Sequence, residues 1–84
     1  MIIKEKQVRW ACKRGMLELD LLLNNFVNHV YKSLTKIQKQ HFYNLLQLED
    51  QELFNALYNN KKLAIIKLQE IIQLIKQSSY KYDK

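Results

Sequence analysis

Residues 10–20 read Trp-Ala-Cys-Lys-Arg-Gly-Met-Leu-Glu-Leu-Asp, and this stretch places the first corner of the fold. It holds the only tryptophan, cysteine and glycine of the chain, and one of two arginines against twelve lysines. Glycine is the residue best suited to a left-handed helix end, so Gly15 predicts the end of one helix and the start of the next. An arginine beside it, at position 14, indicates a use for the planar guanidinium and not for charge alone.

Length and composition predict one small helical domain. A chain of 84 residues is expected to fold as a single domain, residues 1–84, and to bury about 60–65% of its unfolded surface. The absence of proline and the single glycine favour helices joined by short polar connections. We therefore expect an all-α fold, a compact antiparallel bundle of about five short helices, with frayed tails at residues 1–3 and 78–84.

Apolar residues at helical spacing predict where these helices lie. The expected ranges are about 4–14, 16–31, a helix after Thr35, a short helix after Asp50, and 62–77. Thr35 and Gln38 have the form of a capping box, and Asp50 is interpreted as an N-cap. The apolar stripes are Met16, Leu19, Leu23, Phe26, Val27 and Val30; Ile37, His41, Phe42, Leu45 and Leu46; Leu53, Phe54, Leu57 and Tyr58; and Leu68, Ile71, Ile72 and Ile75.

The sequence indicates a cytoplasmic protein without stable membrane insertion. No apolar run approaches the roughly 20 residues that span a bilayer, and the N-terminus has no apolar core of signal-peptide length. Cys12 cannot form an internal disulfide, which is consistent with a reducing compartment.

The net charge of +6 is unevenly distributed along the chain. Residues 1–14 and 61–84 each carry +4, whereas residues 15–60 carry −2. Basic ends of this kind could meet nucleic acid, an acidic protein or a membrane surface. A solvated, lysine-rich surface explains the same pattern.

The sequence offers no phosphate loop and no metal site. A loop that cradles phosphate needs several glycines, and this chain has only Gly15. A metal site needs three or four ligands in one place, whereas His29 and His41 are expected on different helices. We therefore predict no bound metal and no stably bound cofactor.

Catalytic side chains are not expected either. The acidic cluster is interpreted as capping a helix N-terminus, because acids are favoured there (Glu49, Asp50 and Glu52). A Cys12–histidine nucleophile pair has no local pattern to support it, so Cys12 is expected to be a small, half-buried side chain. The chain is predicted not to be an enzyme.

The corner around Gly15 has two interpretations. Arg14 is expected at the end of the first helix and Glu18 in the first turn of the second. The turn between them would contain Gly15, which has no side chain. Together with Trp10 they would form a binding hot spot. Alternatively, they form a capped turn with a local Arg14–Glu18 ion pair.

Residues 10–20 strongly resemble the signature of the SdhE/YgfY family of succinate dehydrogenase FAD assembly factors. That signature reads roughly W-x-C-R-R-G-M-x-E-L-D, with R-G-x-x-E at its centre. Residues 45–57 are similar to the family's L-L-x-x-x-D-x-x-L-F-x-W-L segment, and Phe26 falls where the family places an aromatic residue. The resemblance covers about residues 7–75.

This chain departs from the family pattern at three positions. Lys13 stands where arginine is common, Leu17 where a polar residue is frequent, and Ala56 where tryptophan is usual. The third change implies different packing around the fourth helix. None of these changes affects Arg14 or Glu18.

The resemblance implies a chaperone that binds the flavoprotein subunit of succinate dehydrogenase, of fumarate reductase, or of both. Such proteins promote covalent attachment of FAD to a histidine of that subunit, and the flavin is handled by the flavoprotein. The implied contact residues are Arg14, Gly15 and Glu18, surrounded by Trp10, Arg9, Met16 and Asp20. In this hypothesis Arg14 pairs with a group of the flavoprotein, and Glu18 orients Arg14 or bonds to the flavoprotein backbone.

Two other classes stay open on the sequence. Members of this family have carried an antitoxin label (CptB), and a helical regulatory partner would use the same kind of surface. A basic nucleic-acid-binding module is the second class, but the arginines are not clustered on one recognition helix. The prediction is therefore a protein partner and no nucleic acid.

Overall fold

The computed structural model describes residues 4–63 and 65–82, with side chains up to Ser79. The elements in chain order are α1 (Glu5–Ala11), α2 (Leu17–His29), the 3-10 turn η1 (Tyr31–Ser33), α3 (Lys36–Leu45), α4 (Asp50–Tyr58) and α5 (Ile66–Tyr82). These residues contain no strand, so the predicted all-α class is confirmed. Within the described ranges, no helix is both long and apolar enough to cross a bilayer.

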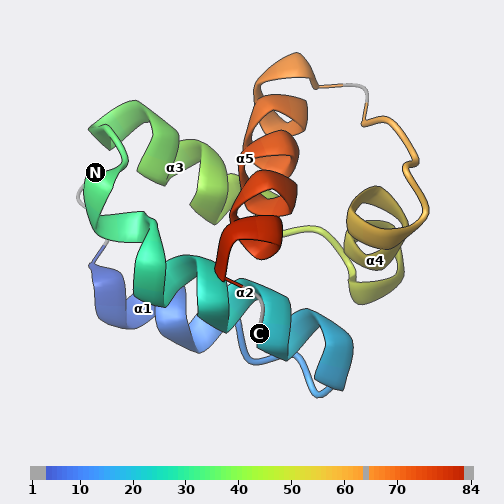
Figure 1. Cartoon of the computed structure of the whole chain (residues 1–84), viewed down its shortest axis with the longest axis horizontal. Coiled ribbons are helices and arrows are strands. Elements are labelled where there is room, and N and C mark those ends of the chain that lie inside the picture. Colours follow the sequence, from blue (N-terminus) through green and yellow to red (C-terminus); the bar gives the residue numbers. More distant parts are fainter. Residues whose placement is uncertain (1–3, 64, 83–84) are drawn as a thin grey trace.

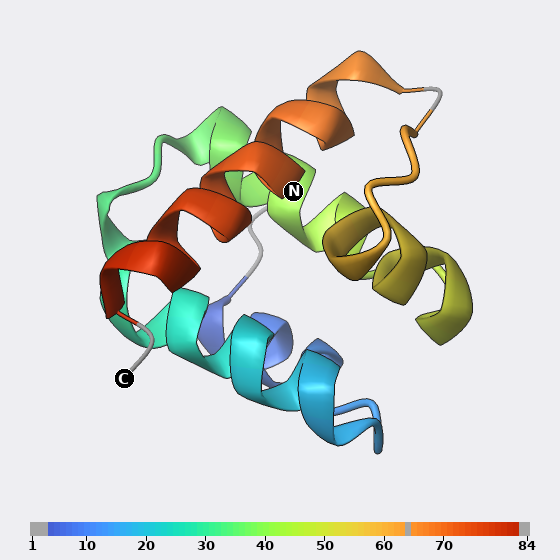
Figure 2. The same cartoon turned by 45° about the vertical axis from the view of Figure 1, so that its right-hand side comes forward.

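The last helix organises the molecule. Figure 1 shows α5 between α3 and α4, with α1 and α2 crossing below it. The turned view in Figure 2 shows the same helix lying over α2 and α3. Helix α5 makes contacts with α2, α3 and α4, so it joins three of the helices that precede it in the chain.

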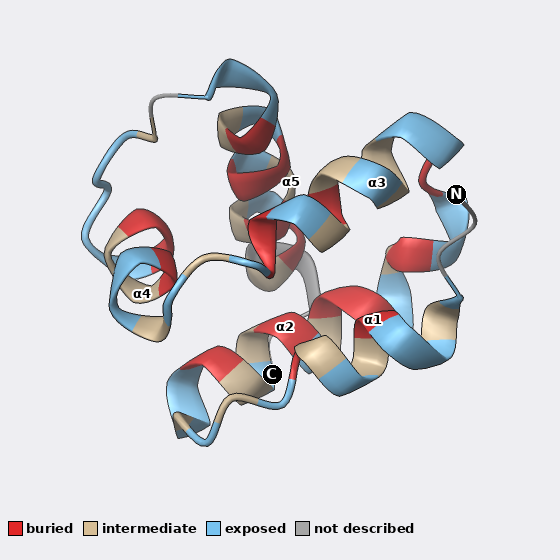
Figure 3. Ribbon diagram, turned by 180° about the vertical axis from the view of Figure 1, so that it is seen from behind, coloured by how far each residue is buried: buried red, intermediate tan, exposed pale blue. Residues whose placement is uncertain are grey.

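The core lies between these helices and is largely aliphatic, with one aromatic cluster. The rings of Phe26 and Phe42 have centroids 5.0 Å apart, and the Tyr31 ring lies 5.9 Å from that of Phe42. Val8 is fully buried and anchors α1. Figure 3 shows the buried positions on the inner sides of the helices. The predicted core residues of α2 and α5 that are buried are Leu19, Leu23, Phe26, Val27, Leu68, Ile71, Ile72 and Ile75.

Some predicted core positions face outward or only partly inward. Ile37 is 68% exposed, since it lies five residues before buried Phe42 and thus more than a third of a turn away around α3. Tyr58 is 45% exposed. The remaining stripe residues outside the buried set are half-buried: Met16, Val30, His41 and Phe54.

The helix boundaries agree with the prediction at α3 and differ elsewhere. The capping box is confirmed: Gln38 N–H donates to Thr35 Oγ1 (3.1 Å), and Thr35 N–H donates to Gln38 Oε1 (2.9 Å). Helix α1 ends at Ala11, earlier than predicted.

Helix α5 begins and ends later than predicted. It begins at Ile66, because the Leu63 N–H instead donates to the Gln69 side chain (3.0 Å) ahead of the first turn. It continues past Gln77 to Tyr82, and in this last part Ser78 is buried, with its hydroxyl donating to the Ile75 carbonyl (2.9 Å). Residues 1–3 and 83–84 of the predicted frayed tails lie outside the described residues.

Candidate functional site

The connection between α1 and α2 is a four-residue corner, residues 13–16. Gly15 has a φ of +79°, so the predicted left-handed backbone is confirmed at this position. A Cβ added to Gly15 would meet no atom within 4 Å, which shows that the outer side of the corner is open. Arg14 belongs to this corner and not to the end of α1, which corrects the predicted placement.

The Arg14 side chain points inward and binds four acceptors. Its Nε donates to Asp50 Oδ1 at 2.6 Å. Nη1 donates to the carbonyls of Ala11 (3.0 Å) and Leu46 (2.7 Å), and Nη2 donates to the carbonyl of Leu48. The side chain is only 12% exposed.

These acceptors belong to helix ends that meet at one point. Ala11 is the last residue of α1, Leu46 is the C-cap of α3, and Asp50 is the first residue of α4. Carbonyl groups at a helix C-terminus lack intrahelical donors and carry partial negative charge. The guanidinium therefore satisfies the ends of α1 and α3 and joins them to α4.

This geometry corrects two predictions. The partner of Arg14 is Asp50 and not Glu18, so the local ion pair at the corner does not form. Asp50 is not the N-cap of α4: Glu49 occupies that position, without a side-chain capping bond. The carboxylate of Asp50 turns instead to the guanidinium.

Three of the other predicted contact residues also have internal roles. Asp20 Oδ1 accepts the backbone N–H of Arg14 at 2.8 Å and so shapes the corner from inside. Arg9 donates to Glu5 (3.0 Å) and Asn28 (2.9 Å), which ties α1 to α2. Met16 is the N-cap of α2 and packs half-buried against the core.

Trp10, Gly15 and Glu18 are the predicted contact residues that lie exposed. The Trp10 side chain is 76% exposed, and Lys13 Nζ lies 5.9 Å from its ring centroid. Glu18 is in the first turn of α2, as predicted. Its carboxylate has no hydrogen-bond or ion-pair partner within residues 4–63 and 65–79, while its backbone carbonyl accepts the Tyr58 hydroxyl (3.0 Å).

The predicted residues line two separate surfaces. Trp10, Arg9 and Arg14 line a broad open groove of about 1090 Å³ between α1 and the end of α3. We call this the α1–α3 groove. Glu18 lines a small hollow of about 190 Å³ with Leu21 of α2 and Tyr58 of α4. The structure thus does not bring Arg14 and Glu18 into one pocket.

Sequence reasoning assigned only Arg9, Trp10 and Arg14 of the groove residues to a site. Asp50 was interpreted only as a cap, although it lies within the second segment of the family resemblance, residues 45–57. Tyr43 and Gln47 also line the groove. Nothing in their spacing distinguishes them from ordinary residues of a helix and its C-terminus.

Cys12 is buried, and the two histidines lie on different helices. Cys12 is 5% exposed, more deeply buried than expected, and burial raises the pKa of its thiol from 9.0 to about 12. His29 ends α2 and His41 lies on α3, as predicted. The described part of the chain contains no group of three or more His, Cys, Asp or Glu side chains placed to hold a metal ion.

Comparison with known proteins identifies the family. The model of a family described as the flavinator of succinate dehydrogenase matches residues 6–79. A relative from Wigglesworthia glossinidia brevipalpis, named FAD assembly factor SdhE, is 41% identical over 83 residues, which are 98% of this chain and 99% of the relative. Proteins of the same name are 39% identical in Coxiella burnetii (92% of this chain, 94% of the relative) and 38% identical in Yersinia pseudotuberculosis (88% and 84%). This chain therefore belongs to the SdhE family of succinate dehydrogenase FAD assembly factors.

Proposed function

We propose that this chain binds the flavoprotein subunit of succinate dehydrogenase and promotes the covalent attachment of FAD to it, without catalysing the reaction itself. Support comes from a family match that spans residues 6–79 and from relatives named FAD assembly factor. The flavoprotein subunit of fumarate reductase is an additional or alternative partner in this proposal.

The observation that carries the proposal furthest is the exposed Glu18 carboxylate beside the open Gly15 corner. A carboxylate in the first turn of a helix, without an internal partner in the described structure, is free to accept N–H groups of another protein. The left-handed Gly15 leaves that corner without a side chain, so the backbone of a partner can approach closely.

In this proposal the flavin is held and transformed by the flavoprotein. FAD supplies the redox chemistry of that subunit when it is attached. Gly15 is the only glycine here, so the chain has no glycine-rich loop that could hold a diphosphate at a helix N-terminus. The role of this chain is to hold its partner in an arrangement competent for attachment.

Arg14 contributes to this function as a positioning residue. Four bonds to the protein itself occupy its guanidinium, so it holds the corner that presents Gly15 and Glu18. This replaces the hypothesis in which Arg14 pairs directly with the flavoprotein and is oriented by Glu18.

The proposal is tested with Glu18→Ala in cells that lack the wild-type chain. The measurement is covalent flavin fluorescence of the denatured flavoprotein subunit, and we expect a loss of about tenfold or more if Glu18 is a hot spot. The melting temperature should fall by only about 1–8 °C, because an exposed acid in a first helical turn contributes about 0.3–1 kcal/mol.

Glu52→Ala is the matched control, since Glu52 is an exposed acid in the first turn of α4. It should leave flavin attachment at the wild-type level. Full attachment in cells without any copy of the chain would refute the assembly role for that flavoprotein. Equal loss from both variants would refute the placement at Glu18.

A further inference from the structure

The α1–α3 groove is a second surface, separate from the hollow at Glu18. One wall consists of α1 and the residues after it, including Lys6, Trp10 and Lys13, and the other includes Tyr43 and Gln47. Figure 3 shows α1 and α3 together on the back of the molecule. The groove is open to solvent, as suits a segment of another protein rather than an enclosed small molecule.

The charges of the groove do not cancel. Four cations line it, and its two carboxylates, Glu5 and Asp50, are each paired with one of the two arginines at 3.0 Å and 2.6 Å. The ammonium groups of Lys6 and Lys13 have no carboxylate and no hydrogen-bond partner in the part of the chain that the structure describes. The groove therefore presents two uncompensated positive charges.

An exposed aromatic side chain lies between these charges in the sequence. Trp10 is 76% exposed, and its ring is in contact range of the Lys13 ammonium. Tryptophan is enriched among the residues that carry the energy of protein–protein interfaces, because one rigid ring buries a large apolar area. The groove thus combines an apolar anchor with a positive field.

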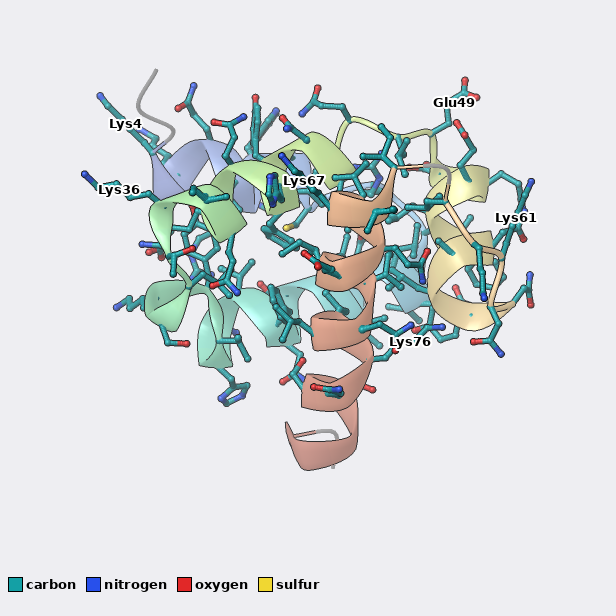
Figure 4. All side chains as sticks on the ribbon, turned by 90° about the horizontal axis from the view of Figure 1, so that it is seen from above. Lys4, Lys36, Glu49, Lys61, Lys67 and Lys76 are labelled. Carbon is teal, nitrogen blue, oxygen red and sulfur yellow. The ribbon has the colours of Figure 1, made fainter. Side chains whose placement is uncertain are left out.

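The lysines labelled in Figure 4 lie outside the groove and are spread over the molecule rather than arranged in one row. Figure 4 shows Lys36 and Lys61 pointing outward at opposite ends of the molecule, with Lys67 and Lys76 along α5. A nucleic-acid site needs a row of cations that follows the phosphates, and its affinity is governed by their number. Two free ammonium groups beside an indole instead match a peptide with a few carboxylates and one apolar side chain.

We propose that the α1–α3 groove binds an extended acidic segment of the flavoprotein subunit, with the carboxylates of that segment on Lys6 and Lys13 and an apolar side chain on Trp10. This inference rests on the proposed function. It adds a second contact to the one at Glu18, on a different surface.

The test measures the affinity of the purified, flavin-free subunit for three forms of this chain. The double variant Lys6→Glu/Lys13→Glu should bind at least about tenfold more weakly than the wild type. The control Lys36→Glu/Lys61→Glu makes the same change in net charge at exposed lysines outside the groove, and it should bind like the wild type. The wild-type affinity should also fall more steeply with salt than that of the groove variant.

Each outcome separates the two proposals. Unchanged binding by the groove variant, or equal weakening by both double variants, would overturn the groove while leaving the proposed function intact. Failure of the wild type to bind the subunit would overturn the proposed function, and the groove assignment with it. All three forms should first show the same melting temperature, since the four lysines are exposed.

Trp10 provides a direct readout of the groove because it is the only tryptophan. A short peptide of alternating glutamate and alanine should change its emission in the wild type and not in the groove variant. An oligothymidylate of matched length should have the weaker effect at physiological salt. A response to the oligothymidylate alone would overturn the assignment to a protein segment.

Discussion

Arg14 lies where the ends of α1, α3 and α4 meet, and its side chain satisfies acceptors from all three. A planar guanidinium offers five N–H donors in a fixed fork, and the structure uses it for one carboxylate and three carbonyls. The geometry thus explains why this lysine-rich chain has an arginine at position 14: an ammonium group cannot donate to four acceptors around a planar group.

Replacement of Arg14 by alanine should destabilise the fold. It would leave the carbonyls of Ala11, Leu46 and Leu48 without this donor, and we expect the free energy of unfolding to fall by about 2–3 kcal/mol. Urea denaturation followed by circular dichroism measures this change.

Two companion variants make that measurement specific. Arg14→Lys should recover less than half of the loss, because it keeps the charge without the fork. Arg9→Ala, which removes an exposed ion pair, should cost less than about 1 kcal/mol. Wild-type stability in Arg14→Lys would show that charge alone is sufficient.

Cys12 should be inert to thiol reagents in the folded protein. Its thiol is buried and protonated, so labelling near neutral pH should be at least about a hundredfold slower than in the urea-unfolded chain. Stopped-flow or mass-spectrometric labelling measures both rates. Equal rates would show that the corner opens readily.

The same thiol makes stability depend on alkaline pH. Because folding raises its pKa from 9.0 to about 12, the contribution of the neutral thiol is complete below pH 9 and is lost as the pH rises toward 12. Cys12→Ala should lack this component of the pH dependence between those values.

At the scale of elements, α3 is defined at its start by the reciprocal bonds of Thr35 and Gln38. Thr35→Ala removes the acceptor for the Gln38 N–H and should cost about 1 kcal/mol of stability. Thr35→Ser keeps the hydroxyl and should behave like the wild type in thermal melting. A loss in the serine variant equal to that in alanine would indicate that the methyl group matters, and not the cap.

The connection from α4 to α5 is held by side chains rather than by regular structure. Asn60 adopts a left-handed φ of 56°, and its Oδ1 accepts the Lys76 ammonium at 2.6 Å. The Lys61 N–H returns to the Asn55 carbonyl (3.1 Å), which closes the end of α4. These contacts hold residues 60 and 61 outside regular helix, and α5 begins at Ile66 rather than near residue 62.

On the scale of the whole molecule, the fold presents two surfaces on different elements. The α1–α3 groove lies along α1 and the end of α3, and the Glu18 hollow lies between α2, α4 and α5. Arg14 lines the groove and, through its backbone bond to Asp20, shapes the corner that precedes Glu18. The corner is therefore in contact with both surfaces.

Variants at Gly15 distinguish a loss of stability from a loss of partner binding. Both Gly15→Ala and Gly15→Arg place a side chain in a left-handed backbone, at about 1–2 kcal/mol, and neither Cβ meets another atom. We expect equal melting temperatures and lower covalent flavin in the arginine variant, since bulk at the open corner would block a partner.

Gly15→Asn completes that comparison, because asparagine tolerates a left-handed backbone. It should retain more stability than the alanine variant. Equal flavin attachment in the alanine and arginine variants would show that only the backbone conformation at Gly15 matters.

The sequence by itself determined the features that depend on near neighbours. Gly15 and helical periodicity together identified the five α-helices of the described residues, and periodicity identified most of the buried positions of α2 and α5, because an apolar face repeats every three to four residues. The capping box at Thr35 and the left-handed Gly15 were likewise predictable, since each is set within a few residues.

Only the tertiary structure decided what the long side chains contact. The Arg14 guanidinium binds groups 32 to 36 residues further along the chain, and no spacing rule connects those positions. Burial was decided in the same way: Tyr58 of the α4 stripe is 45% exposed, whereas Leu53 and Leu57 of the same stripe lie in the core. The physical reason is that local sequence determines whether a segment is helical, whereas the packing of helices against one another determines which side chains come into contact.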